Sequence, residues 1–156
     1  MELHLPRWNQ LPGIALYMDQ VVLVLGEMLS PFATAQEGPL VTPTMINNYV
    51  KMKLTPPPEK KKYTREHLAL FVMICLLKKV FSMTELAGLK KCLLETHSLE
   101  EGYDLFCQEM EIRMQAMDGP DTAACPPVLA AAVRSVASKI QVEKLLDCAE
   151  NSGNCG

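Results

Sequence analysis

The sequence predicts an all-α protein built as a helical bundle. Segments with apolar residues at helical spacing recur along the chain, and no segment shows a convincing strand period. The composition agrees, because Met is abundant with 10 copies while aromatic residues make up 6%, which suits helical packing better than a β-sandwich. With 156 residues and a hydrophobic fraction of 49%, the chain can bury one sizeable core. About six helices are expected.

The first helices follow a lead-in with two Pro and a Gly, residues 5–13, from which Trp8 is expected to dock onto the body. Residues 16–29 (LYMDQVVLVLGEML) form the first predicted helix, and residues 30–41 a loop that holds at most one helical turn, in FATAQ. Thr42 then has the character of an N-cap, with Pro43 at the first helical position. The helix that they open is expected to end near residue 53.

The next helices are marked by their caps. After LTPPPEKKKY, Thr64 opens a helix over 65–80 that is apolar nearly all round and therefore predicted to be the buried centre of the protein. Capping boxes at Ser82 with Glu85 and at Ser98 with Glu101 predict helices to about residues 95 and 117. A linker at 118–127 leads into the last predicted helix, Val128–Glu150.

Charge is distributed unevenly along the chain. The net charge is −3, yet residues 43–67 hold six Lys and Arg against two Glu, which gives this segment +4 and the remainder −7. A basic segment inside an acidic chain is a local electrostatic footprint that the overall isoelectric point hides.

The predicted helix 43–53 has two different faces. At about 100° per residue, its polar positions share an arc of roughly 100°; they are Thr44, Asn47, Asn48 and Lys51. The opposite arc holds Met45, Ile46, Tyr49, Val50 and Met52, and Lys53 falls on that side at the helix end. Asn can pair bidentately with adenine in the major groove, and Lys can neutralise phosphates. Any half-buried surface helix also has a solvated polar face, which is the alternative interpretation.

The segment PPPEKKKY places three consecutive Lys after a rigid run of Pro, which would hold a basic loop at a set distance from the helix. Such a loop can straddle a phosphate backbone or enter a minor groove as a wing does, although lysine runs are often only solvated. Together the helix and the loop predict a surface for double-stranded DNA made by Thr44, Asn47, Asn48, Lys51, Lys53, Lys60, Lys61, Lys62, Tyr63 and Arg65.

These residues also carry a resemblance. The order of TPTMINNYVKMKLTPPPEKKKYTREHLALFVMICLLKKVFSMTEL, over about residues 42–86, resembles the DNA-binding half of MerR-like (mercury-resistance-type) regulators. A closer likeness, over about residues 5–86, is to the uncharacterised bacterial domain-of-unknown-function family 1836, in LPRW…LP…LYMDQ, TPTMINNYVK and PPPEKKKYTREHLA. The MerR likeness implies a winged helix-turn-helix transcription regulator, usually a dimer, with a DNA-binding domain at 1–96 and a C-terminal helical region at 97–156.

Two features depart from that pattern. A helix-turn-helix joins its helices by about 3–4 residues, whereas the loop 30–41 is much longer, so either FATAQ is a short first helix or the motif is degenerate. The reading face also has no Arg, the side chain that most often contacts guanine, so A·T-rich sites are the better expectation.

Other site chemistry is weak. We find no His-Glu-x-x-His, no Gly-rich phosphate loop and no nucleophile elbow, and the acidic helix 101–111 is better explained as a solvated face, so no enzyme activity and no cofactor are expected. Cys92 with His97 could begin a metal site, but no second pair completes it; the six Cys are expected to be reduced in a cytoplasmic protein. No membrane span is expected.

Three alternatives stay open. The helix 43–53 and its lysines could instead dock an acidic partner protein, which would make the chain a non-enzymatic interaction module. The apolar stripe of Val128–Glu150 could pair two subunits or cover the core of its own chain. The Met-rich segment with Met110, Met114 and Met117 could fill the core or line a pocket for an effector of unknown identity.

Overall fold

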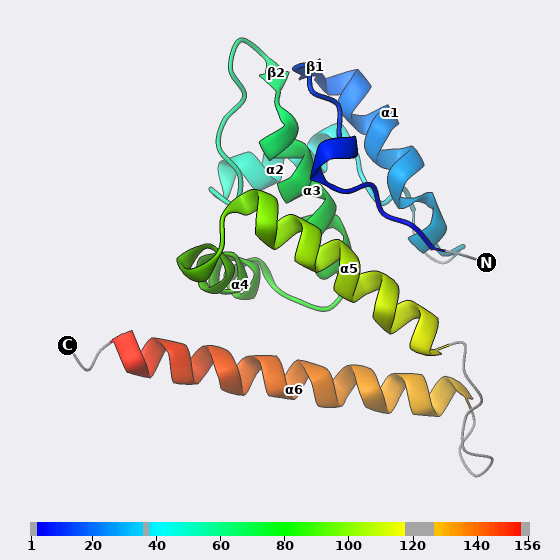
Figure 1. Cartoon of the computed structure of the whole chain (residues 1–156), viewed down its shortest axis with the longest axis vertical. Coiled ribbons are helices and arrows are strands. Elements are labelled where there is room, and N and C mark those ends of the chain that lie inside the picture. Colours follow the sequence, from blue (N-terminus) through cyan, green and yellow to red (C-terminus); the bar gives the residue numbers. More distant parts are fainter. Residues whose placement is uncertain (1–2, 36–37, 118–126, 154–156) are drawn as a thin grey trace.

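The computed structural model describes residues 3–35, 38–117 and 127–153, and the prediction of an all-α protein is confirmed over them (Figure 1). The described α-helices are α1 (Met18–Leu29), α2 (Pro43–Lys51), α3 (Arg65–Leu77), α4 (Met83–Thr96), α5 (Leu99–Met117) and α6 (Pro127–Gly153). Two short 3-10 turns, η1 (Trp8–Gln10) and η2 (Ser30–Phe32), and two two-residue strands, β1 (Leu16–Tyr17) and β2 (Lys62–Tyr63), complete the described elements.

The two strands are a feature that sequence patterning missed. β1 and β2 pair antiparallel, with Leu16 opposite Tyr63 and Tyr17 opposite Lys62. Strands of two residues are too short to show any alternation, so the helix predicted over 16–29 in fact begins at Met18, after β1. The pairing matters for position, because it fastens the segment before α3 to the segment before α1.

α3 is the centre of the protein, as its apolar sequence predicts. Every residue from His67 to Leu76 is buried, because α1, α2 and α5 surround this helix (Figure 1). Two of these positions, His67 and Cys75, carry groups that can hydrogen-bond, and both have partners. The buried helix α3 therefore forms the core against which the surrounding elements pack.

The C-terminal helices begin where their capping boxes predict. The Ser82 hydroxyl accepts from the Glu85 N–H at 3.2 Å while the Glu85 carboxylate accepts from the Ser82 N–H at 2.9 Å, which satisfies two N–H groups at the start of α4. Glu85 has a second, long-range role, because Lys139 of α6 donates to its carboxylate at 2.6 Å. This ion pair, and the packing of Leu146 beside Gly88, hold α6 against α4.

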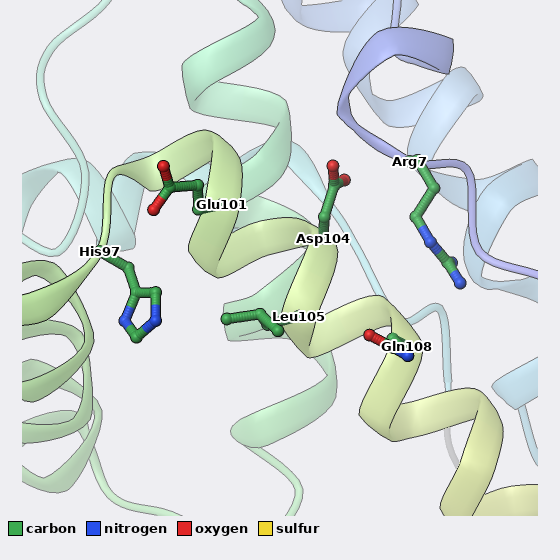
Figure 2. A pocket seen from close by; sticks show the side chains of 6 residues that line it. All are labelled: Arg7, His97, Glu101, Asp104, Leu105 and Gln108. Atoms are coloured by element: carbon green, nitrogen blue, oxygen red, sulfur yellow. The ribbon is translucent and has the colours of Figure 1, made fainter.

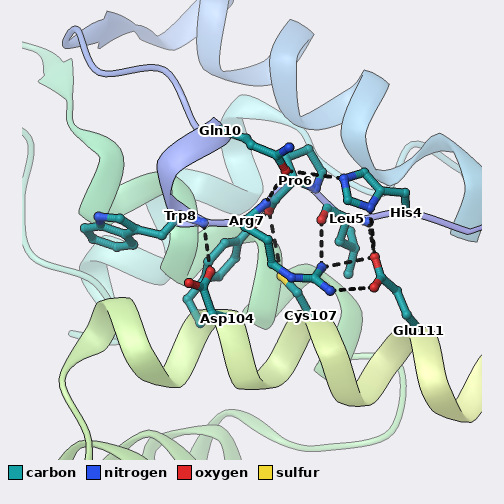
Figure 3. A network of polar contacts seen from close by, with 10 residues as sticks. His4, Leu5, Pro6, Arg7, Trp8, Gln10, Asp104, Cys107 and Glu111 are labelled. Carbon is teal, nitrogen blue, oxygen red and sulfur yellow. Dashed lines mark hydrogen bonds and ion pairs between the residues drawn. The ribbon is translucent and has the colours of Figure 1, made fainter.

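α5 completes the core together with the N-terminal lead-in. Tyr103 and Cys107 are fully buried, and both donate to the Pro6 carbonyl, at 2.6 and 3.8 Å (Figure 3). Trp8 docks as expected: its backbone N–H donates to the Asp104 carboxylate at 2.8 Å and its ring meets Tyr103 edge-on. The division of the chain at 96/97 stays a prediction, although residues of α5 beyond it share one core with α3.

An ionic contact fastens the same lead-in. Glu111 of α5 accepts from both terminal guanidinium nitrogens of Arg7, at 2.6 and 3.0 Å, and from the Leu5 N–H at 2.9 Å (Figure 3). The Arg7 hydrogen bond, followed by the Leu5 N–H and the charges of Arg7 and His4, lowers the pKa of Glu111 to about 2. These contacts join residues about 100 positions apart, and no local sequence pattern announces them.

Candidate nucleic-acid interface

α2 has the two faces that its sequence predicts. Ile46 and Tyr49 are buried against the core. The polar residues Thr44, Asn47, Asn48 and Lys51 are all exposed. Thr42 caps the helix as expected, its hydroxyl accepting from the Met45 N–H at 3.2 Å. α2 therefore presents two amides and an ammonium group outward from one short helix, as hydrogen bonding to an extended partner requires.

Contacts to α3 set the orientation of α2. The Tyr49 ring lies 6.4 Å from Phe71, and its hydroxyl lies 4.0 Å from the Cys75 sulfur. Burial, followed by the neighbouring thiol, raises the pKa of Tyr49 above its ordinary value. Lys78 reaches over this ring and donates to the Leu40 carbonyl at 3.0 Å, which ties the loop before α2 to the end of α3. The outward face of α2 is thus held on a buried scaffold.

α2 ends in a Schellman motif whose left-handed position is a lysine. Lys53 has φ 61°, its N–H donates to the Val50 carbonyl at 3.0 Å, and the Leu54 N–H donates to the Tyr49 carbonyl at 3.0 Å. Gly, sometimes Asn, normally takes this position. Because the helix ends at Lys51, the next two side chains turn outward, and Met52 is 52% exposed although the helical phase had placed it on the apolar face.

The tip of the basic loop is a two-residue hairpin turn. Glu59 and Lys62 exchange backbone hydrogen bonds at 3.1 and 2.9 Å, and between them Lys60 and Lys61 have φ 50° and 64°. Positive φ at both central residues is the mark of a type I′ turn, whose preferred sequence is Asn-Gly. Both lysine side chains are exposed. The turn lies in the loop that connects α2 to β2 (Figure 1).

The residues with left-handed backbone conformation in the described part of the chain are all lysines. Among the described residues, the only three with positive φ are Lys53, Lys60 and Lys61, and no described Gly has a positive φ. Each costs an L-residue about 1–2 kcal/mol relative to a right-handed conformation. Within the described residues none of the three forms an ion pair with a carboxylate. The strain is therefore concentrated in exposed cations without acidic partners.

His67 anchors the proline segment between the helix and the tip, a role that the sequence did not reveal. Its Nδ1 accepts from the Thr64 N–H at 3.0 Å, so its Nε2 carries the proton and donates to the carbonyls of Pro56 and Pro57 at 3.1 and 3.3 Å. The ring also packs edge-on against Tyr63. A histidine three residues after a cap residue, downstream of consecutive prolines, is the signal that could have suggested it.

Three predicted contact residues lie differently from the rest. Tyr63 is 3% exposed, with its ring packed against Phe71 at 5.7 Å, so its assignment to the nucleic-acid surface is corrected: this side chain belongs to the core. Lys62 is half-buried and lies 5.1 Å above the Tyr17 ring. Arg65 is half-buried and lies over Trp8, on the side of the lead-in.

The connection between α1 and α2 does not have the short turn of a compact helix-turn-helix. After α1, residues 30–32 form η2, and the part of FATAQ that the structure describes beyond Phe32 is not helical. The buried Phe32, Leu40 and Val41 fasten this long connection to the core. Of the two possibilities that the sequence left open, a short first helix in FATAQ is therefore excluded over its described residues.

A depression in the surface beside the start of α5 has mostly polar walls. It has a volume of about 530 Å³ and is lined by Arg7, His97, Glu101, Asp104, Leu105 and Gln108 (Figure 2). Of the lining groups, Asp104 accepts from the Trp8 backbone N–H, Arg7 binds Glu111, and His97 Nδ1 lies 2.8 Å from the Thr96 hydroxyl. The described residues contain no cluster of three or more metal-ligating side chains, and Cys75, Cys92, Cys107 and Cys148 are free thiols.

Comparisons with known proteins identify a family without an assigned activity. The family model described as Domain of unknown function (DUF1836) matches residues 6–106, which include α1 to α4 and the start of α5. No curated protein and no solved structure matches the chain. None of the helices in the described ranges is long and apolar enough to cross a membrane.

Proposed function

We propose that this chain, which belongs to the DUF1836 family, is a DNA-binding transcription regulator of the winged, MerR-like type, with a degenerate helix-turn-helix whose connection is long. The observation that carries the proposal is the coincidence of left-handed backbone with exposed lysine at positions 53, 60 and 61. Gly or Asn could occupy each of these positions with less backbone strain. Strain of this kind is found mainly where it positions a functional group.

The lysines are suited to phosphate contacts. Lys51 and Lys53 stand at the end of α2, and Lys60 and Lys61 stand at the tip of the following loop, all exposed. In the proposal α2 enters the major groove while the hairpin tip, acting as a wing, meets the neighbouring backbone or minor groove. Each phosphate neutralised releases counterions, so binding should weaken steeply with salt.

The exposed amides of α2 are suited to base contacts. Asn47 and Asn48 are neighbours, and neither side-chain amide has a hydrogen-bond partner within the described residues, so their donors and acceptors are available. An Asn side chain can pair with the N6 and N7 atoms of adenine. With Thr44 on the same side, these groups favour A·T-containing sites.

The test is fluorescence anisotropy with a library of duplex fragments from the source genome, at several salt concentrations. We expect binding whose logarithmic salt slope becomes smaller by about 0.9 for each phosphate-contacting lysine replaced by Ala. Lys144→Ala, an exposed lysine of α6, is the matched control and should leave the slope unchanged. A slope that is the same for Lys61→Ala and the wild type contradicts the proposal.

A second candidate is a protein-interaction module that uses the same surface. The exposed Met52 between Lys51 and Lys53 supports it, since an apolar side chain ringed by charge is common at protein interfaces. Pull-down after nuclease treatment separates the two candidates. A partner protein that persists without nucleic acid, together with no affinity for duplex DNA, would favour the module.

Pairing of two chains through α6 belongs to the proposal, because dimeric regulators read two half-sites. α6 contacts α4 with the face that carries Lys139, while Ile140 and Leu145 remain 48% and 62% exposed. Light scattering should give twice the mass of 17.3 kDa for the wild type and the single mass for an Ile140→Glu, Leu145→Glu variant. Gln141→Glu is the control; a monomeric wild type contradicts the pairing.

A further inference from the structure

The helices α3, α4 and α5 enclose a second cavity that no part of the proposed DNA surface uses. Its volume is about 380 Å³, within the range of small-ligand pockets. Val142 of α6 contributes to its wall, and α6 passes beneath α4 and α5 in Figure 1. Apart from Lys90 and Glu109, every residue that lines it is apolar or Gly.

The two charged residues of this wall are not equivalent. Glu109 already accepts from Arg113 at 2.6 Å on the exposed side of α5. Lys90 has no acidic partner among the described residues; its one hydrogen bond goes to the Leu54 carbonyl, at 2.8 Å. An ammonium group has three donors, so two remain for a ligand. Burial also lowers the pKa of Lys90, a sign that its charge is poorly compensated in the protein alone.

This combination selects one chemical class of occupant. A neutral apolar molecule would fill the cavity but offer no acceptor to the two remaining Lys90 donors, and a cation would be repelled. A carboxylate would form a charge-assisted hydrogen bond, which is among the stronger polar contacts in a partly buried site. We propose that the cavity binds an amphipathic monocarboxylate, with the carboxylate at Lys90 and an aliphatic chain among the leucines of α4 and α5.

The position of Lys90 connects this cavity to the DNA surface. Leu54 lines the cavity, its carbonyl accepts from Lys90, and its N–H closes the Schellman motif after α2. A carboxylate that draws the ammonium away from Leu54 therefore loosens the turn that sets Lys53. On the basis of the proposed function, the ligand should lower DNA affinity, and by linkage DNA should lower ligand affinity by the same factor.

Binding is tested by calorimetry on the full chain with decanoate, kept below its critical micelle concentration. We expect saturable binding of decanoate that is about tenfold or more weaker in Lys90→Met, which keeps the apolar stem but removes the charge. Lys91→Met, the exposed neighbour on α4, is the control and should bind as the wild type does. Equal affinities of Lys90→Met and wild type, or of decanoate and decan-1-ol, would overturn the proposal.

The cavity itself is tested by filling it. Leu94 lines the cavity and is 38% exposed, so Leu94→Trp can place its larger, largely apolar ring in the space. Circular dichroism checks that this variant is folded. The folded variant should no longer bind decanoate. If the folded Leu94→Trp variant binds decanoate as well as the wild type does, the ligand does not occupy this cavity. If Leu94→Trp does not fold, the comparison of Lys90→Met with Lys91→Met still tests the carboxylate contact.

The coupling is tested separately from the binding. Saturating decanoate should weaken DNA binding in the anisotropy assay about tenfold, within the usual range of allosteric coupling. Decanoate that binds without changing the DNA affinity overturns the coupling. A chain that binds decanoate but no DNA at all overturns the proposed function, while the calorimetric result for the cavity stands on its own.

Discussion

Replacing Lys60 and Lys61 by Asn and Gly should stabilise the protein and weaken its binding to DNA. Both residues have positive φ, 50° and 64°, in a turn whose preferred sequence is Asn-Gly. Left-handed backbone costs an L-residue about 1–2 kcal/mol, and Asn and Gly relieve most of that cost. The greater freedom of Gly in the unfolded chain takes back about 0.5–1 kcal/mol.

The net gain from this double substitution is therefore about 1–2 kcal/mol in the free energy of unfolding, or roughly 3–6 °C in the melting temperature of a chain of this size. Urea unfolding followed by circular dichroism measures it. The matched control is Lys60→Ala with Lys61→Ala, which removes the same two charges but keeps a side chain with a β-carbon at each left-handed position. Its stability should lie within about 0.5 kcal/mol of the wild type.

The two double variants separate strain from charge. Both should lose DNA affinity, with a salt slope smaller by about 2, because both lose the same two ammonium groups. Only the Asn-Gly variant should gain stability. If its unfolding free energy equals that of the Ala pair, the turn stores no relievable strain, and the argument from strained lysines to function is refuted.

Three other substitutions test contacts that hold the lead-in, the proline segment and α6 in place. Glu111→Gln should lower the unfolding free energy by about 2 kcal/mol through the lost ion pair with Arg7, against no change for the exposed Glu109→Gln. Because the folded pKa of Glu111 is lowered to about 2, its contribution is complete above pH 4.5 and is lost as the pH falls towards 2, a loss that urea titrations of Glu111→Gln should lack. His67→Phe keeps the ring packing but removes both proline contacts, so DNA affinity should fall more than for a surface substitution. Glu85→Gln should speed hydrogen exchange in α6, and unchanged exchange would show that this ion pair does not hold the helix.

Local patterns were enough to predict most of the described fold. Caps at Thr42 and Ser82 each use short-range hydrogen bonds between residues three positions apart, so sequence spacing specifies them directly. The buried helix α3 was predictable because apolar residues on all its faces leave no side for solvent. The outward face of α2 followed from the phase of Ile46 and Tyr49 alone.

Several features that sequence reasoning missed depend on contacts between distant segments. The pairing of β1 with β2 joins residues 16 and 63, and the carboxylate of Glu111 holds a segment about 100 residues away. Tyr63 was placed on the surface because it follows three lysines, but the β-bridge turns its ring inward while Lys62 turns out. Neighbouring strand residues point to opposite faces, and which of the two is buried cannot be predicted until the partner strand is known.

The left-handed lysines are a different kind of omission, because sequence preference argued against them. Lys-Lys is a poor choice for a type I′ turn, and Lys is a poor choice at the end of a Schellman motif. Other segments of the chain do satisfy their backbone with favoured residues, as Thr42 with Pro43 does at the start of α2. Three exposed lysines thus occupy backbone positions that favour Gly or Asn, while the nearby helix cap has favoured residues. Selection for a positive charge at a set position would produce this difference. That is why these three residues, more than the lysine count, direct the proposal towards a polyanion.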